Sequence, residues 1–182
     1  RSGYTALYGN TIGSGNAAFG FQALLNNTTG YNNTSIGHNA LVYNTTGIYN
    51  TAVGKDAAFS NIYGANNTAL GYAALYYNTS SNSLTAVGWQ SLYSNTTGTQ
   101  NTALGHQSMR YNTTGYGNTA VGYNAMINGA GGFRNTAIGA SCLGSLQSTA
   151  ICNVAVGSNA GPVLTVGQYN AILGDYSCNN LT

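Results

Sequence analysis

Charged residues are almost missing from this chain of 182 residues. Lysine, arginine, aspartate and glutamate together make up 3% of it, against roughly 25% in a typical globular domain. The four cations and two acids are scattered, which gives a net charge of +2 and no basic stripe that could follow a phosphate backbone. A nucleic-acid partner is therefore not expected. Because 43% of the residues are hydrophobic, the low charge does not indicate a disordered chain either.

Long apolar runs, proline and cysteine are also scarce. No run of about 18 apolar residues is present, so the sequence predicts no membrane span. Proline occurs once, at Pro162, and the three cysteines lie late in the chain, at Cys142, Cys152 and Cys178. This odd number allows one disulfide with a spare thiol, or no disulfide at all. The cysteines can equally be read as small residues of a buried core.

One phrase is repeated from end to end of the chain. The stretch NTAVGYNAM at Asn118–Met126 recurs as NTALGYAAL from Asn67 and as NTSIGHNAL from Asn33. The opening Asn returns with a constant 17-residue period, with Leu84 in its place once and a single longer step before Asn153. A fixed period over a whole chain is the signature of a repeat architecture. We therefore treat residues 1–182 as a single repeat domain, in which residues 140–182 form less regular terminal coils.

Each period reads as one coil of a β-solenoid. After the Asn come Thr, Ala, an aliphatic residue and Gly, which fit a short strand with Thr and the aliphatic residue on one face and Ala on the other. A small residue and a Leu follow, as in a second short strand, and Asn-Thr-Thr-Gly then supplies a turn. The sequence thus predicts an all-β fold, a parallel β-roll of about ten 17-residue coils with two short strands per coil.

Stacked identical coils place like residues on like residues. We expect Asn ladders at the corners, a Thr ladder, and a core in which the aliphatic row and the Leu row are buried together. The predicted core ladder consists of Ile36, Val53, Leu70, Val87, Leu104, Val121, Ile138, Leu41, Leu75, Leu92 and Leu143.

Enzymatic chemistry is not expected. The two carboxylates, Asp56 and Asp175, lie seven coils apart, or roughly 33 Å at a strand spacing of about 4.7 Å, whereas a glycosidase pair needs about 5–9.5 Å. His38 and His106 are four coils apart, roughly 19 Å, too far to share a metal ion. They occupy the residue after the Gly, a row so varied that it should face solvent. We predict no catalytic residue, metal site or cofactor.

The phrases NTAVG, NTALG and NTAIG, with a continuation of the form xxAL as in NTALGYAAL, resemble the SVAIGxxAxA head repeats of trimeric autotransporter adhesins. Similar repeats occur in the shafts of phage tail fibres, and the resemblance runs from Gly3 to Gly174. It implies a left-handed parallel β-roll in which three chains pack side by side with small residues at the seam. By that pattern the chain-to-chain seam would contain Ala52, Ala69, Ala86, Ala103, Ala120 and Ala137, although these alanines equally suit a tight coil. The repeat is longer than the family's, and a wider coil could be stable as a single chain.

Two surface features bear on function. Asn-x-Ser/Thr acceptors for N-glycosylation occur in the turns at Asn27, Asn44, Asn78, Asn95 and Asn112, although Asn and Thr also suit a turn. Tyrosine is abundant, with 15 residues, and either stacks on itself along the rod or offers rings to sugars and partners.

Two functions are therefore considered. The first is a structural segment of a fibre, outside the cell, on the cell surface or on a virion, which provides length, stiffness and protease resistance. The alternative is an adhesive or receptor-binding segment that contacts glycans or matrix through its Tyr- and Asn-rich face. The expected partners are copies of the chain itself, in a side-by-side trimer or stacked end to end in a longer fibre.

Overall fold

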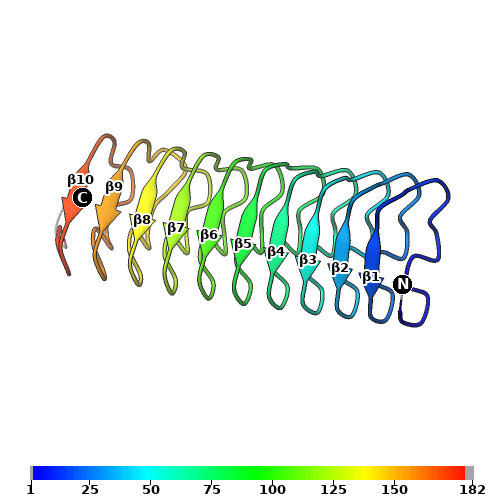
Figure 1. Ribbon diagram of the computed structural model, residues 1–182. Coiled ribbons are helices and arrows are strands. Elements are labelled where there is room, and N and C mark those ends of the chain that lie inside the picture. Colours follow the sequence, from blue (N-terminus) through cyan, green and yellow to red (C-terminus); the bar gives the residue numbers. More distant parts are fainter. Residues whose placement is uncertain (1, 179–182) are drawn as a thin grey trace.

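The computed structural model describes residues 2–178, which form a rod of stacked coils (Figure 1). Its ten three-residue strands make one parallel sheet, in which each strand is hydrogen-bonded to the next one along the chain. They are β1 (Ala17–Phe19), β2 (Thr34–Ile36), β3 (Thr51–Val53), β4 (Thr68–Leu70), β5 (Thr85–Val87), β6 (Thr102–Leu104), β7 (Thr119–Val121), β8 (Thr136–Ile138), β9 (Val154–Val156) and β10 (Ala171–Leu173). The predicted β-solenoid is confirmed. The described residues contain no helix with the length and apolar character of a transmembrane span.

The register places equivalent residues of neighbouring coils next to each other. Thr51 of β3 pairs with Thr68 of β4, and Val53 pairs with Leu70. The glycine after each strand lets neighbouring backbones come close: Gly54 has a φ of 133°, and a Cβ there would lie 2.6 Å from the carbonyl oxygen of Gly71. Only glycine fits this approach without a shift of the backbone.

The second predicted strand of each coil is wrong, because that segment is a tight turn. Two residues of it have left-handed backbone angles, with a φ of 57° at Asn39 and 49° at Leu41. This conformation costs an ordinary side chain about 1–2 kcal/mol. Full burial of Leu41 offsets the cost, and its amide donates to the carbonyl of Ala57 in the next coil at 3.0 Å. So short a coil closes only if the chain reverses sharply here, which the alternation of residues did not reveal.

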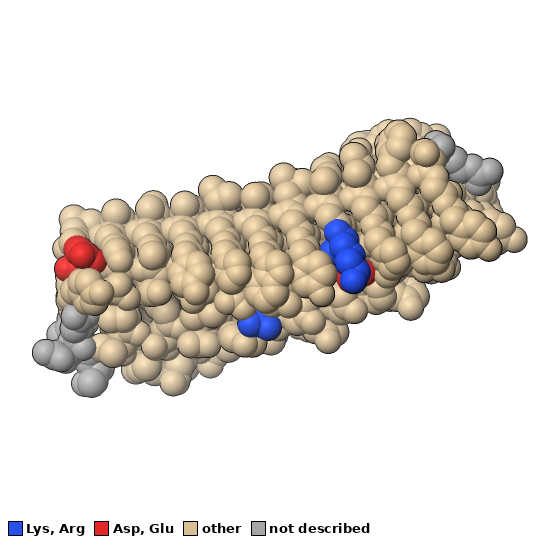
Figure 2. Space-filling model, turned by 90° about the horizontal axis from the view of Figure 1, so that it is seen from below, with Lys and Arg blue, Asp and Glu red and all other residues tan. Residues whose placement is uncertain are grey.

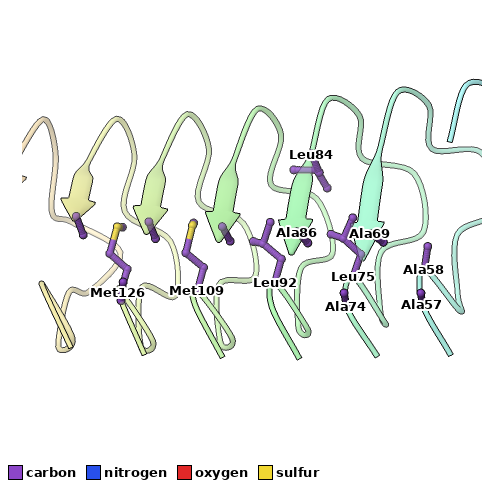
Figure 3. Packing of buried hydrophobic residues seen from close by; sticks show 14 of the residues in the cluster. Ala57, Ala58, Ala69, Ala74, Leu75, Leu84, Ala86, Leu92, Met109 and Met126 are labelled. Carbon is purple, nitrogen blue, oxygen red and sulfur yellow. The ribbon is translucent and has the colours of Figure 1, made fainter. Parts of the chain in front are cut away.

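The core lies between the strand alanines and the row of leucines opposite them. Ala69 and Ala86 point from β4 and β5 toward Leu75 and Leu92 (Figure 3). The predicted leucines of this row are confirmed as buried, with no exposed surface. They are Leu41, Leu75, Leu92 and Leu143.

The prediction that the aliphatic row belongs to the core was wrong. Three of its members are more than 40% exposed and four are half-buried on the outer side of the sheet. The exposed ones are Ile36, Leu104 and Ile138, and the half-buried ones are Val53, Leu70, Val87 and Val121. The coil is too narrow for two rows of large side chains. The small alanine therefore faces the leucine row, and the alternation of the strand turns Thr and the aliphatic residue outward.

The predicted asparagine ladders are present, and two of them run along the inside of the rod. In the turn, Nδ2 of Asn44 donates to Oδ1 of Asn27 at 2.8 Å and to the carbonyl of Gly47 at 3.0 Å. In the ladder that precedes the strands, Nδ2 of Asn33 donates to the same carbonyl at 2.8 Å. The Gly47 carbonyl thus joins the two ladders and helps to close the coil.

The last coils keep the sheet register but change the interior. The pairing of Thr136 with Val154 preserves the ladder across the longer step. Residues up to Gly144 pair with the preceding coil at the usual sequence separation, whereas Ile151 and the residues after it in the same coil pair at a separation that is one residue longer. The extra residue therefore lies in the turn between Gly144 and Ile151. Leu146 and Leu164, both buried, occupy the interior position that Asn holds in earlier turns. The predicted irregularity after residue 140 therefore replaces a polar ladder by apolar packing.

Candidate functional surfaces

The outer sheet face is the most regular surface of the rod. It consists of the first and third residues of β1–β10, which alternate with the buried middle residue in every strand. One row is mainly Thr and the other is aliphatic apart from Phe19, and no residue of these strands is charged. The result is a strip of hydroxyl, methyl and larger apolar groups with no charged side chain.

A second surface row stacks aromatic rings along the axis. This aromatic row consists of the residues that follow the repeat glycines from Gly3 to Gly122: Tyr4, Phe21, His38, Lys55, Tyr72, Trp89, His106 and Tyr123. The ring of His106 lies between those of Trp89 and Tyr123, with centroids 4.9 and 5.3 Å away and interplanar angles of 11° and 20°. The row is exposed, as predicted.

Further rings stack in the row that follows the buried leucines. The ring centroids of Phe59 and Tyr76 are 4.8 Å apart, and those of Tyr76 and Tyr93 are 5.2 Å apart. The guanidinium of Arg110 continues this row over Tyr93 at 5.8 Å. Burial, followed by a hydrogen bond with Tyr77, raises the pKa of Tyr93 to about 12.

This stacking bears on the two interpretations of the tyrosines. A sugar stacks on the open face of an aromatic ring, whereas several rings in both rows have a face covered by a neighbouring ring. The arrangement supports mutual shielding along the rod. Tyr43, Tyr49 and Tyr77 instead pack edge-on against a neighbouring ring and are about half exposed.

Charged and metal-binding side chains do not gather on the described surface. Figure 2 shows one face on which the few blue and red atoms form small groups, one of them a blue side chain beside red atoms, with wide uncharged areas between the groups. Nζ of Lys55 lies 3.9 Å from Oδ2 of Asp56, whose other oxygen accepts a hydrogen bond from Asn39 at 3.0 Å. No group of three His, Cys, Asp or Glu residues that could hold a metal ion occurs within residues 2–178.

The predicted glycosylation acceptors lie inside the folded rod, so their assignment as surface sites was wrong. All five have essentially no exposed surface: Asn27, Asn44, Asn78, Asn95 and Asn112. The nitrogen to which a glycan would be attached donates hydrogen bonds instead. In Asn95 it donates to Oδ1 of Asn78 at 3.3 Å and to the carbonyl of Gly98 at 3.0 Å. The Asn-x-Thr pattern arises because an inward Asn is followed by turn residues.

The predicted seam alanines also lie in the interior of a single chain, so they cannot meet a neighbouring chain. Each is fully buried as the middle residue of a strand: Ala52, Ala69, Ala86, Ala103, Ala120 and Ala137. The alternative reading, that they suit a tight coil, is the correct one. Any side-by-side contact must therefore use other residues.

The three cysteines are free thiols in this structure. Cys142 is buried, and its Sγ donates to the carbonyl of Ala155 at 3.3 Å. Burial raises the pKa of this thiol to about 11, although a backbone hydrogen bond with Ile138 acts in the other direction. Cys152 and Cys178 are partly exposed. Of the expected alternatives, the structure has no disulfide, and Cys142 is a core residue.

The described part of the rod has no pocket. In comparisons with known proteins, no family model matches the chain, and no curated protein or solved structure is similar enough to count as a relative. The chain is thus a parallel β-solenoid with a repeat of about 17 residues, and no family match links it to the adhesins or tail fibres whose repeats it resembles.

Proposed function

We propose that this chain is a structural segment of a fibre outside the cell or on a virion, where it supplies length, stiffness and protease resistance. The observation that carries the proposal is the unbroken ladder of contacts between coils. The ten strands pair in chain order, so every coil is attached to the one before and the one after it.

The direction of these bonds suits a load-bearing role. The amide of Leu75 donates to the carbonyl of Ser91 in the next coil at 3.0 Å, and the amide of Gly88 donates back to Leu70 at 2.8 Å. Such bonds run along the rod, together with bonds between Asn side chains, so a pull on the ends loads several of them at once in each coil. Nine strand steps of about 4.8 Å give roughly 43 Å of rod.

Protease resistance is expected because neighbouring coils are hydrogen-bonded to each other along the rod. A protease must bind an extended segment of several residues, and here the turns as well as the strands are hydrogen-bonded to their neighbours. For example, the amides of Thr96, Thr97 and Gly98 all donate to the carbonyl of Thr113. Local opening, which proteolysis needs, would break contacts with two adjacent coils.

The adhesive alternative has less support. A glycan receptor usually offers open aromatic faces or a pocket, whereas many rings of this rod are stacked on one another and its described residues form no pocket. The contact surface of an adhesive segment would also differ from its surroundings, but the same rows continue from coil to coil.

Proteolysis combined with imaging tests the proposal. Folded protein and urea-unfolded protein are treated with a protease of broad specificity, and the intact chain is followed by mass spectrometry. We expect the folded rod to survive at least 100 times longer, and electron microscopy to show straight rods. Digestion of both samples at similar rates, or compact flexible particles, would contradict a structural role. Binding to a glycan array by the intact rod would favour the adhesive alternative.

A further inference from the structure

The outer sheet face is an uncharged surface that no other described segment of the chain covers. Leu104 and Ile138 are 45% and 41% exposed on it, while the alanines beneath them are fully buried. Nine strand steps of about 4.8 Å and two rows of side chains give an area of roughly 500 Å². The aliphatic row is the apolar part of this area, and exposed apolar patches often mark interaction sites.

The hydroxyl groups of this face are also free to take part in an interaction. The Thr side chains of the turns bond to the neighbouring coil, as Thr45 does to the carbonyl of Ile62 at 3.2 Å. No such bond is recorded within the described chain for the strand threonines, such as Thr68 and Thr85. They can therefore donate to water or across an interface.

The spacing of the rows favours a second copy of this chain as the partner. Side chains of the aliphatic row recur once per coil, so they fit between the side chains of another surface only if that surface has the same repeat distance. A second copy of this chain has that distance by construction, and it meets the condition along the whole length of the rod. The absence of charged residues from β1–β10 means that identical faces do not repel each other.

Resting on the structural role proposed above, we infer that copies of this chain pack side by side through their outer sheet faces. Their long axes are parallel, and the aliphatic rows interdigitate at the interface. The seam thus contains Val87, Leu104 and Val121 with the neighbouring threonines. The flanking rows enlarge the contact toward the roughly 800 Å² per partner of a standard protein interface.

The first test measures mass in solution by light scattering. The wild-type rod should have at least twice the chain mass of 18.7 kDa. The double variant Leu104→Asp with Val121→Asp adds two charges to the outer sheet face in adjacent coils, and it should weaken association at least 100-fold. The matched control, Thr97→Asp with Thr114→Asp, adds the same charges at exposed turn positions and should associate like the wild type. A monomeric wild type, or a Leu104/Val121 variant that associates normally, would overturn the proposal.

Cross-linking supplies a second test in case the aspartate variant fails to fold. In a chain with Cys142→Ala, Cys152→Ser and Cys178→Ser, a cysteine is introduced by Leu104→Cys or, as the control, by Thr114→Cys. A short bismaleimide should join chains rapidly through the first cysteine and at least tenfold more slowly through the second. Equal rates would contradict the assigned seam.

The outcomes for the seam and for the structural role can be told apart. A monomeric rod that still resists protease would remove the seam and leave the structural role standing. An oligomer held by this face but cleaved quickly would leave the seam standing and remove the structural role. If the wild type is monomeric and lowers the freezing point of water without changing the melting point, the hydroxyl and methyl lattice binds ice instead, and the side-by-side packing is wrong.

Discussion

Removing one asparagine from the inner ladder should destabilise the rod about as much as removing a core leucine. Asn50 is 1% exposed. Its Nδ2 donates to the carbonyl of Gly64 at 2.7 Å and to Oδ1 of Asn33 at 3.1 Å, and its Oδ1 accepts from the amide of Asn67 at 3.0 Å. The substitution Asn50→Ala removes all three bonds.

The magnitude depends on which partners are left without a bond. The carbonyl of Gly64 keeps a donor in Asn61, at 3.1 Å, and Oδ1 of Asn33 keeps the backbone amide of residue 50, at 2.9 Å. The amide of Asn67 loses its acceptor while it stays buried. Two lost bonds at about 1 kcal/mol each and one stranded donor at about 1–3 kcal/mol give a loss of about 3–5 kcal/mol.

Urea unfolding followed by circular dichroism measures this loss, with the midpoint and the slope reported together because solenoids can unfold in parts. Asn128→Ala is the control, since Asn128 is exposed and no side-chain hydrogen bond is recorded for it within the described chain. Asn50→Leu separates polar bonding from packing: Leu84 already occupies the equivalent ladder position and is 1% exposed. Leu should cost about 2 kcal/mol less than Ala, because it fills the space with apolar surface. An Asn50→Ala variant within about 1 kcal/mol of the control would refute the importance of the ladder.

Three further predictions test the interior. Gly54→Ala should lower the free energy of unfolding by more than about 3 kcal/mol, because the new Cβ would lie 2.6 Å from the carbonyl oxygen of Gly71. Gly117→Ala should cost only about 1 kcal/mol, because its Cβ would have no neighbour closer than 3.6 Å. Thermal melting compares the two variants, and equal losses would contradict the close approach of the coils. Burial raises the pKa of the Cys142 thiol to about 11, so the folded state keeps a proton that the unfolded thiol releases above about pH 8.5. The contribution of the buried neutral thiol to stability is therefore complete below about pH 8.5 and is lost as the pH rises through about 11. Cys142→Ala should therefore lose less stability than the wild type between pH 8.5 and 11 in urea titrations, and identical pH profiles would argue against a buried thiol. In a host that attaches N-glycans, folded protein should carry none at Asn95, and a glycan found there by mass spectrometry on protease-resistant rods would show that the ladder is not closed.

The coil and its register could be predicted because they depend on repetition alone. A constant period requires equivalent residues to stack, whatever the path of the chain within a coil. The pairing of Thr51 with Thr68 therefore follows from their separation by one full period. The exception at Leu84 leaves the strand pairing intact, because the side chain changes and the spacing does not.

The assignment of the two faces failed because hydrophobicity was weighed without volume. Val and Leu are more apolar than Ala, so a wide core would bury them. The rod has room for one large row, and the left-handed turn at Leu41 and Leu75 fills it. A short coil that contains two sharp corners leaves space only for small side chains opposite that row. The alanine in the middle of each strand was therefore the better indicator of the interior.

The scarcity of charge follows from the same stacking. In a solenoid each residue is repeated about 4.8 Å away, so a charged row would place like charges side by side, at about 0.9 kcal/mol of repulsion per neighbouring pair even in water. Aromatic rings and amides attract their own copies in this geometry. Lys55 accordingly lies in the aromatic row between His38 and Tyr72, with its Nζ 5.8 Å from the Tyr72 ring centroid. Arg110 follows Tyr93 in its row. Single cations between rings are tolerated, but a ladder of them would push the coils apart, so a rod of this kind obtains its polar surface from Asn, Thr, Ser, Gln and Tyr.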